Sequence, residues 1–210
     1  MTLGQRFARL ATDVSVRRPG LWRLFRPVVR RQFDRMAPVW GQMRSEDAFD
    51  SLKVALGALE PPRRTLDLGT GTGQAAFVIA ERFPATEVVG VDLSPEMLAR
   101  ARSATPARVA DRVRFELADA SKLPYEDGAF DLVTLANMIP FFDELARVTA
   151  PGGSVVFSFS GGAGSRNLQI FPLGAARPSS RKSVERLLHF VLGGRSWRGH
   201  SGPDVLFMGG

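Results

Sequence analysis

The fold of this chain is decided by the stretch TLDLGTGTGQ, which runs from Thr65 to Gln74. Its apolar beginning, with Asp67 near the end, predicts a short buried strand, and the residues that follow, 75–80, predict a helix. Between the two lie three glycines at alternate positions: Gly69, Gly71 and Gly73. Glycine tolerates positive φ and leaves the backbone open to a ligand, while the first N–H groups of a helix favour an anionic or polar group. The stretch therefore predicts a strand, a binding turn and a helix N-terminus.

The composition sets limits on the class of protein. A length of 210 residues suits one α/β domain with an extension. The absence of cysteine excludes disulfides, thiolate metal sites and cysteine nucleophiles. No apolar run is long enough to span a bilayer, and the first 20 residues lack the continuous apolar core of a secretory signal, so we expect a cytoplasmic protein. The Arg-rich, acid-poor start leaves an organellar transit peptide as the alternative.

The positive charge is concentrated near the beginning of the sequence. Residues 1–36 contain nine arginines and two aspartates, whereas the remainder has 19 basic and 19 acidic residues. Apolar residues within 21–36 follow helical spacing, with arginines between them: Leu21, Leu24, Phe25, Val28 and Val29. Pro27 predicts a break, or the first turn of a second helix. The helix is expected either to lie on an anionic membrane or substrate, or to pack on the domain with its arginines in water.

Strands and helices alternate after residue 60. Strands are expected at 64–68, 87–91, 113–118, 130–135 and 154–159, with helices at 74–83, 95–102 and 141–148. Ser94 is the expected N-cap of the second helix, with Pro95 at its first position, and residues 151–153, PGG, are expected to form the turn into the last strand. This order predicts an α/β fold: a doubly wound, mainly parallel, Rossmann-like sheet with helices on both faces.

The pattern weakens after Ser160. We expect a flexible join at 161–164, a loop at 172–180 and a helix at 182–192. The segments 195–200 and 204–208 are candidates for a C-terminal antiparallel hairpin.

An acidic residue follows or ends each of three consecutive strands: Asp67, Asp92 and Asp119. Parallel sheets bind ligands at the carboxyl ends of their strands. A carboxylate after the second strand can accept hydrogen bonds from both hydroxyls of a ribose. A carboxylate after the third strand can accept the amine of an adenine. No Lys or Arg lies in the glycine turn, so the implied ligand is an adenosine with a charged tail that is not a phosphate.

These motifs together resemble the class I S-adenosylmethionine-dependent methyltransferases of the type 11, small-molecule kind. The resemblance covers residues 64–160 and rests on five segments: 66–73 (LDLGTGTG), 89–98 (VGVDLSPEML), 119–120 (DA), 130–133 (FDLV) and 151–153 (PGG). Residues 33–40, FDRMAPVW, also resemble the N-terminal segment of quinone-ring methyltransferases of the menaquinone and ubiquinone pathways. The implied domains are a helical extension or lid at 1–60 and an S-adenosylmethionine-binding methyltransferase domain at 61–210.

The resemblance implies a role for each matching position. The three glycines would admit the methionine portion of the cofactor, Asp67 would lie near its ammonium, Asp92 on the ribose and Asp119 on the adenine amine. Leu93 and Met97 would enclose the adenine, and Asn137 would contact the methionine end and open the substrate pocket. The full set of expected cofactor-binding residues is Asp67, Gly69, Thr70, Gly71, Gly73, Asp92, Leu93, Met97, Asp119, Ala120 and Asn137.

The chemistry expected is alignment of an acceptor with the S–CH3 bond of S-adenosylmethionine. His189 and His200 are the chain's histidines, and neither has the setting of a base, so no catalytic residue and no metal site are assigned. The expected acceptor is a small apolar or anionic molecule such as a quinone, lipid or phenol, and Trp22, Phe25 and Trp40 are either pocket or core residues.

Other classes of protein remain open. An NAD(P)-dependent oxidoreductase shares the turn and Asp92 but usually has GxGxxG. A non-catalytic S-adenosylmethionine-binding module, or an adaptor whose basic arm binds a membrane or nucleic acid, is the second alternative. RNA methylation lacks a supporting series of base-stacking aromatics, so nucleic acid is not the expected partner. The oligomeric state is left open.

Overall fold

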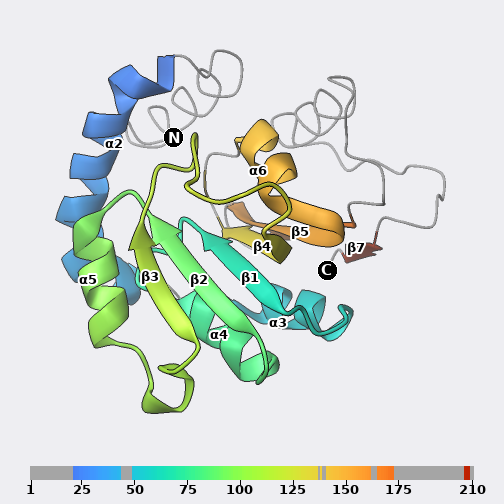
Figure 1. The fold of residues 1–210 in the computed structure, drawn as a ribbon. Helices are drawn as coiled ribbons and strands as arrows, with labels where there is room; N and C mark the ends of the chain where they lie inside the picture. Colours follow the sequence, from blue (N-terminus) through green and yellow to red (C-terminus); the bar gives the residue numbers. More distant parts are fainter. Residues whose placement is uncertain are drawn as a thin grey trace.

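A single mixed sheet forms the centre of the structure (Figure 1). The computed structural model describes residues 21–43, 49–136, 138, 141–161, 165–172 and 206–208. The strand order is β3-β2-β1-β4-β5-β6-β7. The strands are β1 (Arg64–Leu68), β2 (Glu87–Asp92), β3 (Val113–Leu117), β4 (Phe130–Ala136), β5 (Thr149–Gly161), β6 (Ser165–Pro172) and β7 (Leu206–Met208). The first five are parallel, while β6 pairs antiparallel with β5 and β7 antiparallel with β6.

Helices cover both faces of this sheet. They are α2 (Trp22–Met36), α3 (Asp50–Gly57), α4 (Gln74–Arg82), α5 (Pro95–Ser103) and α6 (Phe142–Val148), with 3-10 helices η2 (Ala37–Met43) and η4 (Ala107–Val109). The Ser94 hydroxyl accepts a hydrogen bond from the Met97 N–H at 3.1 Å, which confirms the predicted N-cap of α5. The predicted fold class, a doubly wound and mainly parallel sheet, is confirmed.

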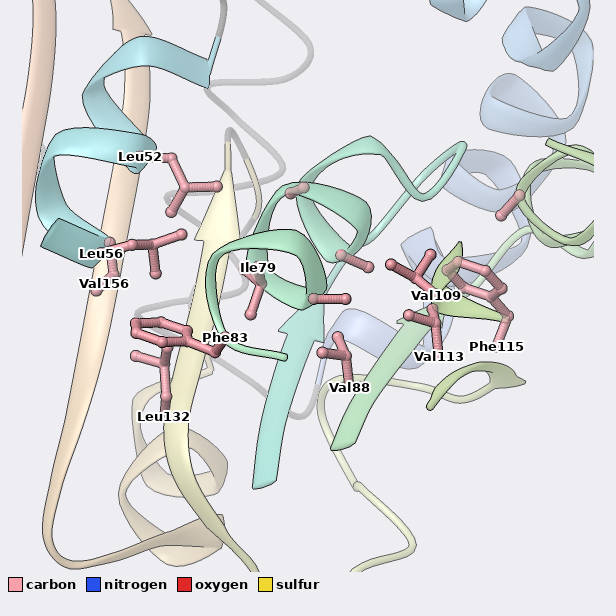
Figure 2. Packing of buried hydrophobic residues seen from close by; sticks show 14 of the residues in the cluster. Leu52, Leu56, Ile79, Phe83, Val88, Val109, Val113, Phe115, Leu132 and Val156 are labelled. Carbon is pink, nitrogen blue, oxygen red and sulfur yellow. The ribbon is translucent and has the colours of Figure 1, made fainter. Parts of the chain in front are cut away.

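Neighbouring residues along β2, β4 and β5 enter two separate apolar clusters. On β2, Val88 packs with α3 and α4 on one face, whereas Val89 and Val91 pack with α6 on the other. Figure 2 shows the first cluster, in which Ile79 of α4 lies above the sheet beside the α3 residues. Period-two alternation with burial on both sides explains why neighbouring positions on β2 and β4, such as Val88 and Val89 or Leu132 and Val133, are both apolar.

The helix over residues 21–36 is continuous, so the predicted break at Pro27 is wrong. Pro27 lies inside α2, where it removes one backbone hydrogen bond of the helix. Contacts made by side chains on both sides of Pro27, described below, hold the two halves of α2 against the domain. Tertiary contacts therefore override the local preference at this position.

Residues 151–153 also differ from expectation, because they lie within β5 rather than before it. Strand β5 already pairs with β4 at Thr149, opposite Phe130, and pairing resumes at Ser154, opposite Leu132. The residues between form an irregularity that Gly152 accommodates with φ of +79°. The predicted turn is thus an interruption inside one long strand.

The region after residue 160 differs most from the sequence interpretation. Strand β6 was not predicted, and it forms by pairing with β5 along its whole length. Strand β7 falls within the predicted 204–208 segment, but in this structure it pairs with β6. The proposed partner segment 195–200 and the proposed helix 182–192 lie outside the described residues.

Close packing at Gly90 of β2 yields the first prediction. A Cβ at Gly90 would lie 2.6 Å from Phe115 Cδ1 and 2.8 Å from Thr70 Oγ1. Because both neighbours are buried, Gly90→Ala should lower the free energy of unfolding by about 1–3 kcal/mol. Urea denaturation followed by circular dichroism measures the change.

Gly57 offers a matched control for this substitution. A Cβ on Gly57, at the end of α3, would meet nothing within 4 Å. Gly57→Ala should therefore leave stability unchanged or raise it by up to about 1 kcal/mol. Equal effects of the two substitutions would contradict the packing argument.

Candidate functional site

Three carboxylates lie at the carboxyl ends of the adjacent strands β1, β2 and β3. The register pairs Asp67 with Gly90, so Asp67 lies two residues deeper in the sheet than Asp92. Asp92 in turn pairs with Leu117, and Asp119 follows two residues later. The three acids therefore lie at the same end of the sheet, as predicted, beside the glycine turn. Each is offset by two residues from the acid on the neighbouring strand.

The turn itself has the backbone conformation that the sequence predicted. Gly69, Gly71 and Gly73 have φ of +71°, +56° and +83°, and residues with a side chain rarely adopt such values. The N–H groups of Gly69 and Thr70 both donate to the Val91 carbonyl at 2.9 Å, which attaches the turn to the end of β2. Gly73 then serves as the N-cap residue of α4.

Asp67 is enclosed beneath this turn. It is 1% exposed and accepts hydrogen bonds from Thr70 Oγ1 at 2.6 Å and from Thr134 Oγ1 of β4 at 2.9 Å. The carboxylate thus braces the turn against the centre of the sheet. The sequence interpretation missed Thr134, although a lone hydroxyl within the apolar run of β4 marks a position that needs a buried partner.

Asp92 connects the glycine turn to α5. Its Oδ2 accepts from the Gly71 N–H and its Oδ1 from the Ser94 N–H, both at 2.9 Å. Burial raises the pKa of Asp92 even though these backbone donors, with that of Leu93, act to lower it. The carboxylate would therefore gain from further donors, such as the hydroxyls of a ligand.

Asp119 is held by the N-terminal helix. Its Oδ1 accepts from Trp22 Nε1 at 2.8 Å and from the backbone and hydroxyl of Ser121, and its Oδ2 accepts from Arg26 at 3.1 Å. Burial alone would raise the pKa of Asp119, but the hydrogen bonds from Ser121, Trp22 and Arg26 lower it below its usual value. Trp22 is buried and also meets Phe141 edge to face at 5.3 Å between ring centroids.

The unit formed by α2 and η2 follows the edge of the sheet. Trp22 and Arg26 contact the end of β3, and the Ser94 hydroxyl after β2 donates to Asp34 at 2.6 Å. Farther along, a Cβ at Gly71 would lie 3.0 Å from Trp40 Nε1. Figure 1 shows α2 beside α5 at the outer side of β3. Residues 22–40 therefore contact the carboxyl ends of β3, β2 and β1 in turn.

The sequence had suggested Trp22 and Trp40 as pocket or core residues, without assigning either to Asp119 or to the turn. The i, i+4 spacing of Trp22 and Arg26 was the available signal, because it places both on one face of a helix. Their shared partner lies more than 90 residues away, and no sequence pattern identified it.

The remaining predicted residues are distributed around the turn. Met97 is buried at the start of α5, whereas Leu93 and Ala120 are partly exposed. Asn137 lies outside the described residues, as do His189 and His200. Its neighbour Met138 is described, and a Cβ at Gly69 would lie 2.6 Å from Met138 Sδ. Trp40 and Met138 are thus the side chains lying on the exposed side of the glycine turn.

Within the described part of the chain, no group of three His, Asp or Glu side chains is arranged to hold a metal ion. Among the same residues, no helix combines the length and apolar character required to cross a bilayer.

Comparison with known families and proteins gives a consistent result. Residues 65–153 match the family model described as a methyltransferase domain. The chain is 49% identical over 110 residues to a demethylmenaquinone methyltransferase of Thermus thermophilus, covering 49% of this chain and 50% of that protein. It is 39% identical over 149 residues to a malonyl-[acyl-carrier protein] O-methyltransferase of Halorhodospira halophila, covering 65% and 49%. The chain spans about half the length of the curated relatives it matches.

Two solved structures share the fold. One is the complex between the Haloferax volcanii Trm112 methyltransferase activator and the putative methyltransferase, with a TM-score of 0.52 and 28% identity over 60% of this chain and 59% of that chain. The other is the [4+2]-cyclase SpnF, with a TM-score of 0.55 and 26% identity over 62% and 58%.

The Trp22–Asp119 hydrogen bond can be tested by a double-mutant cycle. Trp22→Phe removes the indole donor and Asp119→Asn removes the charge, and hydrogen bonds to charged groups are worth about 1.5–3 kcal/mol. We therefore expect a coupling free energy of about 1–2 kcal/mol at pH 7, measured by denaturation of the two single variants and the double variant. A cycle between Trp22→Phe and Asp50→Asn, whose carboxylate pairs with Lys53 in α3, should give no coupling.

The same cycle should depend on pH. Because the folded-state pKa of Asp119 lies below 3.8, its contribution to stability is present above about pH 4 and is lost as the pH falls through the lower folded value. The coupling should therefore be full at pH 7 and absent in strong acid. A coupling that persists after the carboxylate is protonated would contradict the assignment.

Proposed function

We propose that this chain is a class I S-adenosylmethionine-dependent methyltransferase, because its residues 65–153 match the methyltransferase-domain model, and that it transfers a methyl group from S-adenosylmethionine to a small-molecule acceptor. The observation that carries the proposal is the geometry of the strand ends. A turn of three positive-φ glycines lies beside Asp67, Asp92 and Asp119 on adjacent parallel strands. The carboxylates at the strand ends and the side-chain-free backbone of the glycine turn both suit an adenosine whose tail carries an ammonium and a sulfonium.

The chain's own residues fit this cofactor. Asp92 has acceptor capacity beyond its backbone bonds from Gly71, Leu93 and Ser94, and a ribose diol would supply the further donors that its burial favours. Asp119 Oδ2, which also accepts from Arg26, would take the adenine amine. Side chains near these two acids would enclose the adenine: Leu93, Met97 and Ala120. We place the methionine portion along the glycine turn, near Thr70 and Asp67, and Asn137 stays a candidate from the sequence.

S-adenosylmethionine supplies an electrophilic methyl group and a neutral leaving group. The remaining work of the protein is to bind, orient and exclude water, and alignment of the acceptor can lower the barrier by about 7–11 kcal/mol. Trp40 and Met138 lie against the turn, so they would move away from it when the cofactor binds and would then form the wall opposite the turn. The α2–η2 unit would act as the lid, since it already contacts the ends of β3, β2 and β1. No general base is assigned.

The acceptor we propose is a flat apolar ring of the quinone or phenol type. Phe33 and Trp40 meet edge to face at 5.6 Å between ring centroids, and Trp40 lies at Gly71. Aromatic side chains next to the methyl donor would favour a flat ring. Relatives named demethylmenaquinone methyltransferases, at 49% and 33% identity, support the same class of acceptor.

A second function deserves a test because a fold hosts more than one chemistry. The structure titled as a [4+2]-cyclase shares this fold at a TM-score of 0.55. The alternative from the sequence, a protein that binds S-adenosylmethionine without transferring its methyl group, is the second candidate. Detection of S-adenosylhomocysteine as a product, in proportion to methylated acceptor, separates the two.

Calorimetric titration tests the cofactor assignment. S-adenosylmethionine and S-adenosylhomocysteine should bind, NAD should not, and Asp92→Asn should weaken binding of the nucleosides at least tenfold. Because the pKa of Asp92 is raised in the free protein and the ligand hydroxyls favour the carboxylate, affinity should fall as the pH is lowered through that raised pKa.

Two observations would contradict this assignment. One is nucleoside binding that is unaffected by Asp92→Asn, and the other is equal binding of NAD. In the Asn variant the acid-induced loss of affinity should be absent, which separates titration of Asp92 from general acid unfolding.

The acceptor assignment is tested at Trp40. With a reduced naphthoquinone and labelled S-adenosylmethionine, Trp40→Ala should raise the KM for the acceptor about tenfold or more, because the ring contact is lost. Val39→Ala, at a neighbouring side chain that is 46% exposed, should leave the KM unchanged. Methylation of malonyl thioesters in preference to the naphthoquinone would overturn the assignment.

A further inference from the structure

Helix α2 presents two different faces. Trp22 is buried against the domain, and Phe25, Val29 and Phe33 are partly buried on the same side. Leu24 and Val28, by contrast, are 64% and 51% exposed and lie one helical turn apart. The sequence had placed Leu24 and Val28 on the same stripe as Phe25 and Val29. The structure separates them, because the helix is rotated to bring Trp22 to Asp119.

The exposed face continues as a basic surface. Arg31 and Arg35 follow Leu24 and Val28 at spacings of three, four and seven residues, which keeps all four on one side of the helix. The acid within α2, Asp34, is turned toward the domain, where it accepts from Ser94 and pairs with Arg30. Leu24, Val28, Arg31 and Arg35 are defined here as the outer face of α2.

We propose that the outer face of α2 docks on the surface of an anionic lipid bilayer. Exposed aliphatic side chains beside arginines are the combination that enters the boundary between headgroups and acyl chains while pairing with lipid phosphates. A nucleic acid would use the arginines but leave Leu24 and Val28 in contact with water. The excess of four positive charges within residues 21–36, against balanced charge in residues 37–210, would turn this side of the molecule toward a negative surface.

Docking through the outer face of α2 would bring the candidate site close to the bilayer. The inner face of the same helix contacts Asp119 and Ser94 at the strand ends. A bilayer bound to the outer face would therefore lie one helix diameter from the edge where the candidate site is found, about 10 Å. The inference does not depend on methyl transfer, because vesicle binding needs neither cofactor nor acceptor.

Flotation of the full chain with lipid vesicles tests the proposal. Binding should be strong to vesicles that contain phosphatidylglycerol, weak to pure phosphatidylcholine, and reduced at high salt. The double variant Arg31→Gln/Arg35→Gln should bind the anionic vesicles about 30-fold more weakly, from about 1 kcal/mol for each arginine. Leu24→Ser/Val28→Ser should weaken binding about tenfold or more.

The matched control is Val54→Ser/Arg108→Gln. Val54 is 49% exposed on α3, and the Arg108 side chain is 67% exposed and pairs with Glu81, so both substitutions alter similar surface elsewhere. This variant should bind vesicles like the unmodified chain. Circular dichroism and thermal denaturation verify that every variant is folded.

Several results would overturn the proposal. They are equal binding to neutral and anionic vesicles, binding unaffected by either outer-face pair, and binding that depends on the arginines alone. A single-stranded oligonucleotide, measured by fluorescence polarisation, provides the competing arm. Oligonucleotide binding that falls with the arginine variant, in the absence of vesicle binding, would assign the surface to nucleic acid instead.

Discussion

The hydrogen bonds that Asp92 accepts from Gly71 and Ser94 are the interaction on which the site depends. They connect the glycine turn after β1 to the helix after β2, so the two loops at the centre of the sheet edge are fixed relative to one another. The carboxylate can do this because the N–H of Gly71 and the first N–H groups of α5 have no partner within their own elements. The cost of burying the charge is reflected in its raised pKa.

A second layer of contacts supports this arrangement from below. Asp67 accepts from hydroxyls on the turn and on β4, and Gly90 leaves the space that Thr70 and Phe115 occupy. The same small region therefore needs a buried charge, two buried hydroxyls and a residue without a side chain. The contacts beneath the turn hold it rigid, as a site that must orient a cofactor requires, while Trp40 and Met138 lie against its glycines.

The N-terminal helix links the two proposals. Its inner face is tied to the strand ends through Trp22, Arg26 and Asp34, while its outer face carries exposed leucine, valine and arginine side chains. One element would thus cover the cofactor and meet an anionic surface. An apolar acceptor of the quinone class would be found at such a surface.

The sequence alone determined the elements that depend on local physical rules. Residues 64–68 form β1, Ser94 caps α5, and the glycines have positive φ, because periodicity, capping and backbone sterics act within a few residues. The acids at the strand ends were predictable for the same reason. Only the tertiary structure decided the partners of Asp119 and the rotation of α2, since Trp22 lies 97 residues from Asp119 in sequence. Pro27 within a continuous helix and β6 beside β5 likewise depend on contacts between distant segments, which local sequence patterns do not encode.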